Sequence, residues 1–329
     1  MLALITGANG FIGSHLVERL LRRNYSVRCL VRKTSDLKWI QHLPVSLLYG
    51  DITDFHSLLS AVQKVDYVYH LSGKVRALNE DEFFRVNQRG TKNLLESCRL
   101  HAPDLKRFVY ISSQAAAGPS PDGTPLREID PPCPVSIYGK SKLQGELETE
   151  SYRKHFPVTI IRPPSVYGPR DDDILAIFKN IKMGIKPLIG KKTRALSLIH
   201  INDLVDGIVL AAEHPNGANE IFFMANRKSC FMEEWENMVA AALEKKAVFV
   251  RIPEWGLDFT AWIAEIVARL SRKPALLNRD KVLEMKQPHW VVDSSKAERL
   301  LGFTPKIEIK NGIRAVSYTH LTLPTKRIV

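Results

Sequence analysis

A tyrosine and a lysine four residues apart, Tyr138 and Lys142, form the most suggestive chemical pair in the sequence. On a helix, residues at this spacing share a face, so a phenol and an ammonium group would point into the same space. A nearby positive charge favours phenolate and lowers a tyrosine pKa from about 10 towards neutrality. The pair therefore predicts a group that exchanges a proton with an alcohol or carbonyl substrate. Taken alone, the same spacing is also common in ordinary surface pairs.

Two serines, Ser112 and Ser113, end an apolar run that begins near Val109. The run reads as a strand, and ligands of α/β proteins bind at the carboxyl edge of the sheet, where such strands end. We expect Ser113 to hold the substrate oxygen while Tyr138 moves the proton, and Ser112 is the weaker candidate for that role.

Three glycines follow the first expected strand and open the first expected helix. Glycine permits a tight turn and a close approach to a phosphate, and the free N–H groups of the helix face the anion. The segment predicts a dinucleotide-binding loop, with an ordinary structural turn as the alternative. The expected cofactor contacts in it are Gly7, Asn9, Gly10, Phe11, Ile12 and Gly13.

The end of the second expected strand indicates which dinucleotide is bound. An acidic residue there would accept the ribose 2′-hydroxyl of NAD, whereas an arginine suits the 2′-phosphate of NADP. The strand ends in Arg32 and Lys33, with no carboxylate before Asp36. NADP is therefore favoured and NAD remains open, unless the two bases simply begin a solvated loop. After the third strand, Asp51 and Ile52 are expected at the adenine, although Asp51 could instead form a turn.

Short β-branched runs alternate with amphipathic stretches through the first half of the chain. This alternation is typical of βαβ units. We predict an α/β fold: a Rossmann-type doubly wound parallel sheet with a smaller, mainly helical C-terminal substrate lobe. Residues 1–167 would form the NAD(P)-binding domain, with 196–225 returning to it, and 168–195 and 226–315 would form the lobe. The expected strands of the first half are Leu2–Thr6, Ser26–Val31, Ser46–Tyr49, Tyr67–Leu71, Arg107–Ser112 and Val158–Arg162, and the expected helices include Ser14–Arg23, Phe83–Leu100 and Ile137–His155.

Several ordered motifs carry a family resemblance. They are T-G-A-N-G-F-I-G (6–13), H-L-S-G (70–73), N-Q-R-G-T-K-N-L-L-E (87–96), S-S-Q-A-A-A-G (112–118), Y-G-K-S-K (138–142), R-P-P-S-V-Y-G-P-R (162–170) and D-S-S-K-A-E-R-L-L-G-F-T-P (293–305). The chain resembles the extended short-chain dehydrogenase/reductases, in their NAD-dependent epimerase/dehydratase branch, close to the 3β-hydroxysteroid dehydrogenase and dihydroflavonol reductase types. The resemblance covers nearly everything before Val316.

The resemblance implies a role for each matched residue. Tyr138 would be the acid/base, Lys142 would bind the nicotinamide ribose and depress the tyrosine pKa, and Ser113 would orient the substrate. Asn87 would support the site from its helix, or merely pack there. The remaining implied cofactor contacts are Leu71, Ser72, Gly73, Ser112 and Pro163.

Departures from the epimerase pattern shift the expected function towards simple redox chemistry. Arg32 stands where that subgroup commonly has an acid, Gln114 and three alanines follow Ser113, and no Asp-Glu pair stands beside it. We expect an NAD(P)-dependent oxidoreductase that interconverts a secondary alcohol and a ketone. The alternatives are a nucleotide-sugar epimerase or dehydratase with tightly bound NAD, and a non-catalytic NAD(P)-sensing protein.

Composition limits the partners. The net charge of +12 is spread over short basic runs, which is more typical of a solvated surface than of a nucleic-acid site. The four cysteines and ten histidines show no metal-ligand spacing, so no metal is expected. No leader peptide and no apolar span of about 20 residues is evident. We expect a cytoplasmic protein with a small-molecule substrate, no nucleic-acid or membrane partner, and the capacity to form a homodimer through the helices near 83–100 and 137–155.

Two further expectations concern the C-terminal part. Trp255, Phe259 and Trp262 recur at helical spacing and are expected in the core, or less often in an apolar substrate slot. Residues 316–329 read as a non-native tail that interrupts an amphipathic helix starting at Asn311.

Overall fold

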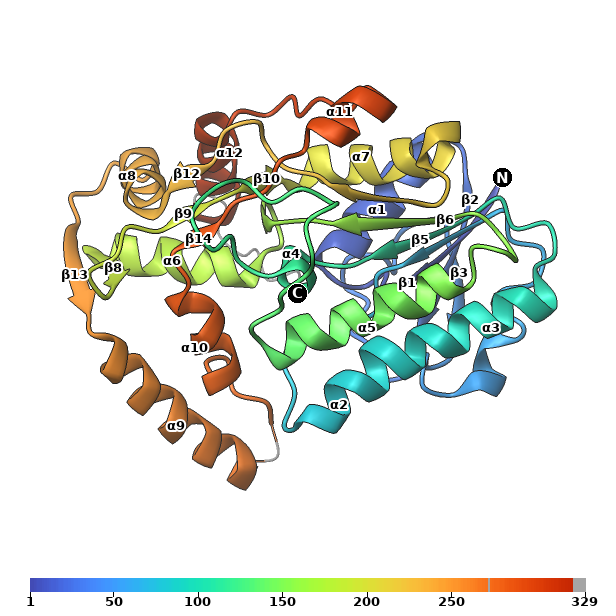
Figure 1. The fold of residues 1–329 in the computed structure, drawn as a ribbon, viewed down its shortest axis with the longest axis horizontal. Coiled ribbons are helices and arrows are strands. Elements are labelled where there is room, and N and C mark those ends of the chain that lie inside the picture. The colour runs from blue at the N-terminus through green and yellow to red at the C-terminus, as the bar shows by residue number, and fades with distance from the viewer. Residues whose placement is uncertain (272, 322–329) are drawn as a thin grey trace.

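A seven-stranded parallel sheet forms the centre of the protein, of which the computed structural model describes residues 1–271 and 273–321. The strand order is β11-β6-β5-β4-β1-β2-β3 (Figure 1). The order reverses on either side of β1, as in doubly wound sheets. The strands are β1 (Leu2–Thr6), β2 (Ser26–Val31), β3 (Ser46–Tyr49), β4 (Tyr67–His70), β5 (Arg107–Ile111), β6 (Val158–Arg162) and β11 (Glu220–Phe223).

Helices cover both faces of this sheet, because successive side chains of each strand point to opposite sides. In β1, Ala3 and Ile5 belong to the core cluster under α1 (Phe11–Arg22) and α7 (Ile201–Glu213), whereas Leu4 belongs to the cluster under α3 (Thr91–His101) and α5 (Ile137–Ser151). The inner strands β1, β4, β5 and β6 are buried on both faces, as their near-continuous apolar runs require, whereas the edge strand β3 is partly exposed. The predicted Rossmann-type doubly wound fold is confirmed.

The remaining elements form a smaller lobe around a separate core that includes Phe178, Trp235 and Ile313. Its helices are α6 (Asp172–Lys182), α8 (Met232–Ala242), α9 (Glu254–Ser271), α10 (Arg279–Lys286) and α12 (Ile309–Leu321). The helix α11 (Ser295–Leu301) instead packs on the core of the main sheet through Ala297 and Leu301. Short strands join them: β7 (Ser165–Tyr167), β8 (Ile185–Ile189), β9 (Ala195–Leu196), β10 (Leu198–His200), β12 (Cys230–Phe231), β13 (Val248–Ile252) and β14 (His289–Trp290). Because β11 extends the main sheet beside β6, we propose the division into domain and lobe given above.

The expected single helix over residues 83–100 is interrupted. The segment consists of α2 (Glu80–Phe84), a π-helical turn at Arg85–Gly90, and α3. A π-turn re-aims the side chains that it carries and is frequent at functional sites. Here it carries Asn87, which is 1% exposed.

The aromatic residues of α9 are not in the core, contrary to the expectation from their spacing. Trp255, Phe259 and Trp262 are 72%, 55% and 49% exposed. Helical periodicity identifies a common face but does not show which face meets the protein. In Figure 1, α9 lies at the margin of the lobe with α10 on one side.

The chain continues as helix through the start of the segment that was expected to be foreign. α12 begins at Ile309 rather than Asn311 and runs to Leu321, and Val316 is buried in the core of the lobe. The rest of the expected tail, residues 322–329, lies outside the described residues. Within the described ranges, no helix is both long and apolar enough to cross a bilayer.

Candidate functional site

The fold brings Ser113 and Tyr138 together at the carboxyl edge of the sheet. Ser113 follows β5 and caps the short helix α4 (Gln114–Ala117), where its Oγ accepts a hydrogen bond from Ala115 N at 3.1 Å. Its side chain also faces the phenol of Tyr138, in the first turn of α5, closely enough to lower the pKa of that phenol. This approach depends on Gly139, because a Cβ there would lie 2.3 Å from the backbone oxygen of Ala115. The glycine inside Tyr-Gly-Lys-Ser-Lys thus lets the two helices touch.

The environment of Tyr138 does not favour phenolate. Burial, and then the negative charge of Glu284, raises the pKa of this phenol above its usual value, while the hydrogen bond with Ser113 acts in the opposite direction. The side chain that lowers the pKa of this phenol here is that of Ser113, and depression of the Tyr138 pKa by Lys142 stays a prediction. Loss of hydration destabilises the phenolate more than the neighbouring groups stabilise it. The phenol therefore stays protonated and can donate its proton.

Lys142 joins α5 to the strand beside it. Its Nζ donates a 2.7 Å hydrogen bond to the carbonyl oxygen of Ile111, the last residue of β5, and lies 4.2 Å from the centroid of the Tyr110 ring. Burial lowers the pKa of this ammonium to about 7. The side chain thus holds α5 against the strand end that leads into Ser112 and Ser113.

Asn87 bridges the loop after β4 and the helix α5. Its Oδ1 accepts from Lys74 N at 2.7 Å, and its Nδ2 donates to Lys74 O at 3.0 Å and to Ser141 Oγ at 2.8 Å. A Cβ at Gly73 would lie 3.3 Å from Asn87 Oδ1 and 3.7 Å from Lys142 Nζ. The amide therefore fixes the Leu71–Gly73 loop beside Lys142, which is more than simple helix packing.

A buried histidine, which the sequence reasoning did not single out, connects this bridge to the first strand. His70 Nδ1 lies 2.7 Å from Thr6 Oγ1, and its Nε2 lies 3.0 Å from Thr91 Oγ1. Burial, and then the charge of Lys142, lowers the pKa of His70 to about 3, so the ring is neutral. Thr91 donates its own proton to Asn87 O at 2.7 Å.

Only one assignment of donors and acceptors fits the hydrogen bonds of this network. Because the hydroxyl of Thr91 donates to a carbonyl, it must accept from His70 Nε2–H, which leaves Nδ1 to accept from Thr6. Thr6 Oγ1 in turn accepts from Ser72 N at 3.1 Å. The chain of hydrogen bonds fixes the loop after β4 against β1 and Asn87, and its only sequence signal is the histidine of the H-L-S-G motif.

The glycine turn provides an anion site at the start of α1. Gly7 has φ of +71°, and a Cβ at Gly13 would lie 2.0 Å from the oxygen of Gly7, so the turn closes directly onto the helix. In the described structure, no side chain caps α1, and its first turn contains no acidic residue. The N–H groups at this end and the positive end of the helix dipole are suited to a pyrophosphate. Asn9, Phe11 and Ile12 lie in the same turn.

The second strand leads Arg32 to the side of this turn. Arg32 is exposed directly after β2, and its backbone N donates to Ser35 Oγ at 3.0 Å. Asn9 Nδ2 reaches the following loop and donates to Asp36 O at 3.2 Å. The loop that carries Arg32 is thus joined to the glycine turn, which suits an adenosine ribose between them.

Asp51 and Ile52 lie after β3 with structural partners of their own. Asp51 Oδ1 accepts from both N and Oγ1 of Thr53 at 2.8 Å, which is the turn-forming role. Ile52 is buried, and its side chain would lie 2.9 Å from a Cβ at Gly90. The geometry of this pair alone supports a turn and a packing contact.

Ser112 and Pro163 line the adjoining ends of β5 and β6. Ser112 is 5% exposed, and its Oγ is a buried polar atom without a hydrogen-bond partner among the described residues. Pro163 is buried, and its carbonyl oxygen accepts from Gln114 N at 2.8 Å. An unpartnered hydroxyl at the carboxyl edge of the sheet is a group that a bound ligand can satisfy.

Two carboxylates from the lobe cap the helix α5, and neither was predicted from the sequence. Asp280 accepts from the backbone N of Ile137 at 2.6 Å and of Tyr138 at 3.2 Å. Glu284 accepts from Ser136 Oγ, the N-cap of α5, at 2.6 Å. Acidic groups at a helix N-terminus satisfy its free N–H groups and complement the helix dipole. No local pattern links residues about 140 positions apart.

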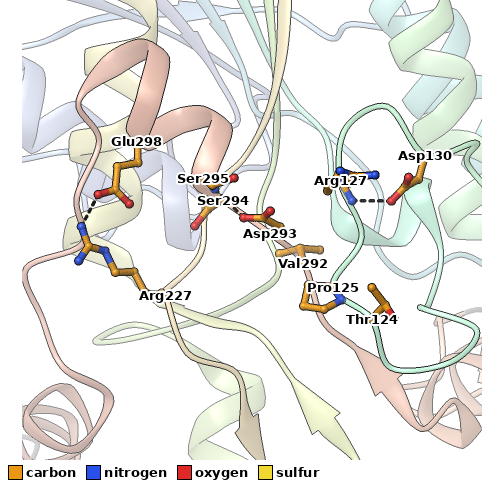
Figure 2. A pocket seen from close by; sticks show the side chains of 10 residues that line it. All are labelled: Thr124, Pro125, Arg127, Asp130, Arg227, Val292, Asp293, Ser294, Ser295 and Glu298. Atoms are coloured by element: carbon orange, nitrogen blue, oxygen red, sulfur yellow. Dashed lines mark hydrogen bonds and ion pairs between the residues drawn. The ribbon is translucent and has the colours of Figure 1, made fainter.

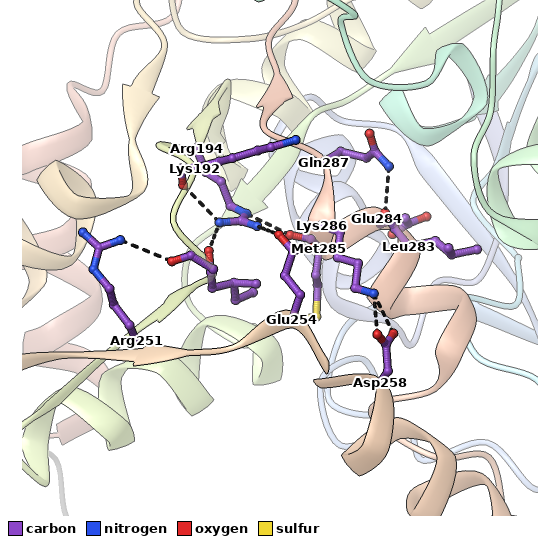
Figure 3. A network of polar contacts seen from close by, with 12 residues as sticks. Lys192, Arg194, Arg251, Glu254, Asp258, Leu283, Glu284, Met285, Lys286 and Gln287 are labelled. Carbon is purple, nitrogen blue, oxygen red and sulfur yellow. Dashed lines mark hydrogen bonds and ion pairs between the residues drawn. The ribbon is translucent and has the colours of Figure 1, made fainter. Parts of the chain in front are cut away.

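A polar network holds α10, which carries these carboxylates, in place (Figure 3). Arg194 Nε donates to Met285 O at 3.0 Å, and Lys286 binds Asp258 of α9 at 2.6 Å. The lobe is thereby connected through α10 to the first turn of α5. Changes in the position of the lobe would reach Tyr138 by this path.

A hollow of about 460 Å³ lies elsewhere, between the 124–130 loop and α11 (Figure 2). Two contacts join residues of its lining, since Arg227 forms an ion pair with Glu298 and the backbone N–H of Arg127 donates to the Asp130 carboxylate. None of Ser113, Tyr138 and Lys142 lines it. The hollow is a mixed-charge surface feature rather than the reaction site.

The comparisons with known proteins agree with this architecture. The model of the NAD dependent epimerase/dehydratase family matches residues 3–225. A UDP-glucose 4-epimerase of Vibrio cholerae is 28% identical over 332 residues, 97% of this chain and 95% of its own. A 3-beta-hydroxysteroid dehydrogenase of Mycolicibacterium neoaurum is 27% identical over 270 residues, 76% and 72% of the two chains.

Solved structures extend the similarity to three dimensions. The structure of Thermus thermophilus UDP-glucose 4-epimerase in complex with NAD has a TM-score of 0.77 and 25% identity, and the match covers 96% of this chain and 97% of that one. Because the family match spans more than half of the sequence, the chain belongs to the NAD-dependent epimerase/dehydratase family of extended short-chain dehydrogenase/reductases and is an NAD(P)-dependent enzyme.

Proposed function

We propose that the protein interconverts a secondary alcohol and a ketone, with Tyr138 as the acid/base. The observation that carries this proposal is that Ser113 and Tyr138 face each other where α4 and α5 meet at Gly139, with buried Lys142 one helical turn further along α5. A hydroxyl to orient an oxygen and a phenol to exchange its proton are the two groups that such a reaction needs. Ser112, Asn87 and Pro163 would support the cofactor and the site around them.

The proposed steps use the residues of this chain as follows. Ser113 Oγ binds the substrate oxygen, and Tyr138 Oη donates a proton to it in reduction or accepts one in oxidation. Lys142 keeps α5 in register with the end of β5. Bound NAD(P) supplies the hydride donor or acceptor. The raised pKa of Tyr138 keeps the phenol protonated near neutral pH, which favours the reductive direction.

The test is a substrate screen with the purified protein. A panel of ketones with NADPH or NADH, and of secondary alcohols with the oxidised cofactors, is followed by absorbance of the reduced nicotinamide and by chiral analysis of the product. Net cofactor turnover supports the proposal. Isomerisation of a nucleotide sugar without net cofactor turnover would instead support an epimerase, which the similarity to the Vibrio cholerae protein over 97% of this chain keeps as the second candidate.

The cofactor preference is proposed to be NADP, on the strength of Arg32. The Arg32→Asp variant should weaken NADPH binding by about 1.5–3 kcal/mol, the range for a charge-assisted hydrogen bond, with little effect on NADH. Fluorescence titration of both cofactors measures this, with Lys33→Ala as the neighbouring control. An unchanged ratio of the two dissociation constants would show that Arg32 does not contact the 2′-phosphate.

Glu284 is proposed as a positioning residue that sets the proton affinity of Tyr138. The Glu284→Gln variant keeps an acceptor for Ser136 but removes the charge that raises the phenol pKa. Reductase activity, which needs the protonated phenol, should then decline at a lower pH than in the parent chain. The control is Glu265→Gln, which removes a carboxylate that binds Arg279 on the outer side of the lobe. A pH profile that does not move would limit Glu284 to a structural role.

A homodimer and a cytoplasmic location are also proposed. The helices expected at a dimer interface expose Leu100, at the end of α3, and Leu147, on α5, at 49% each. The four free cysteines suit a reducing compartment. Sedimentation equilibrium of Leu147→Lys against the parent chain tests the interface.

A further inference from the structure

The exposed face of α9 is made of large apolar side chains. They are Trp255, Phe259, Trp262, Ile263, Ile266, Val267 and Leu270, with exposures from 39% to 82%. Five of the seven recur at intervals of three or four residues, so they form one stripe along the helix. An amphipathic helix on a protein normally turns this kind of face inward.

The opposite face, which meets the protein, is built mainly from small residues. Leu257, Ala261 and Ala268 are the buried residues of α9, and the first two pack with Val282 of α10 and neighbouring side chains. Ion pairs hold the same side of the helix, since Asp258 binds Lys286 and Glu265 binds Arg279 at 2.8 Å. The polarity of the helix is therefore inverted relative to a core-packing helix, with its larger apolar area directed outward.

The charge around the stripe is positive. All three acidic residues of α9 are neutralised by bases, because Glu254 also lies 3.7 Å from Arg194. Arg269 and Lys273 at the end of the helix are exposed and form no ion pair with any described residue. Lys245 and Lys246, which precede β13 and α9, are exposed in the same way. An anionic surface would satisfy these charges.

We propose that α9 is an interfacial helix that docks the protein on an anionic lipid bilayer. Its 18 residues span about 27 Å, at 1.5 Å per residue, and would lie in the plane of the interface. Indole rings favour the headgroup level, and basic side chains at the helix end would contact lipid phosphates. This is surface binding without a spanning helix, and it revises the expectation that no membrane partner is involved.

The charge favours lipid over a second copy of the chain as the occupant of this face. A two-fold pairing of α9 with itself would bury the stripe but would offer no acidic partner to the exposed bases around it, because the acidic residues of α9 are already paired. A bilayer that contains anionic lipid satisfies these charges and buries the same apolar area. The proposal is independent of the reaction assigned to Tyr138, because it concerns only where the protein resides.

The test is cosedimentation of the full chain with vesicles of phosphatidylcholine alone and of phosphatidylcholine with phosphatidylglycerol at a ratio of about 7:3, chosen for its negative surface potential. The parent chain should bind the anionic vesicles, more weakly at high salt. The triple variant Trp255→Ser, Phe259→Ser, Trp262→Ser should bind at least about tenfold less, since affinity scales with the apolar area buried. The control triple variant Tyr49→Ser, Leu78→Ser, Ile129→Ser removes exposed apolar side chains away from α9 and from the proposed dimer interface, and it should bind like the parent chain.

A second pair of measurements separates the charge from the apolar face. The double variant Arg269→Glu, Lys273→Glu should lose affinity for anionic vesicles and leave the weak binding to neutral ones unchanged. Tryptophan emission should shift to shorter wavelength on vesicle binding, and the shift should be absent in Trp255→Phe, Trp262→Phe. Failure of the parent chain to bind, equal binding by both triple variants, or a parent dimer that the α9 triple variant converts to a monomer without vesicle binding would overturn the proposal.

Discussion

Replacing Tyr138 with phenylalanine is expected to lower kcat by about 10²- to 10⁴-fold, the range that general acid/base groups contribute, while NAD(P) still binds. The substitution removes one oxygen, the atom that faces Ser113 and is proposed to exchange the proton. The ring stays, so its tilted contact with Phe83, 6.3 Å between centroids, persists. The loss is therefore expected in the chemical step rather than in folding.

The measurement is steady-state turnover together with a cofactor titration by fluorescence. Tyr152→Phe, in the residue that caps the end of α5 and donates to Glu96 at 2.9 Å, is the matched control and should retain kcat. Ser113→Ala should reduce kcat less than Tyr138→Phe, because binding of the substrate oxygen survives in part through the phenol. Near-parental turnover of Tyr138→Phe would reject the proposed mechanism.

Replacing Glu146 with alanine is expected to lower the free energy of unfolding by about 3–5 kcal/mol, the cost of breaking a buried ion pair by removing one partner. Glu146 and Arg162 form a bidentate pair with distances of 2.9 and 2.6 Å, and their side chains are 1% and 4% exposed. The pair joins α5 to the end of β6. Without the carboxylate, the guanidinium remains buried as an uncompensated charge.

Urea unfolding measures this loss, and the same helix supplies a control. Glu150 pairs with Arg153 at 2.5 Å, but their side chains are 32% and 36% exposed. Glu150→Ala should therefore change the free energy of unfolding by no more than about 1 kcal/mol. Equal losses in the free energy of unfolding for the two variants would show that burial does not determine the contribution of the Glu146–Arg162 pair to stability.

The first half of the fold could be predicted from local patterns because its elements carry them in full. The runs at Leu2–Thr6 and Val158–Arg162 are mostly apolar, which is typical of strands buried on both faces, and both form with those bounds. The π-turn at Arg85–Gly90 could not be predicted, because one extra residue per turn leaves no mark on apolar periodicity. The exposed stripe of α9 could not be predicted either, since periodicity is the same whichever face is covered.

The sequence by itself determined the sheet, the glycine turn before α1 and the identity of the chemical groups, because each depends on residues close together in the chain. Only the tertiary structure decided which groups meet and how they titrate. The contacts of Asp280 and Glu284 with α5, and the hydrogen bonds that run from Thr6 through His70 to Asn87, join segments far apart in sequence. The direction of the Tyr138 pKa was decided there too, because desolvation depends on everything packed around a group, and no spacing along the chain encodes that sum.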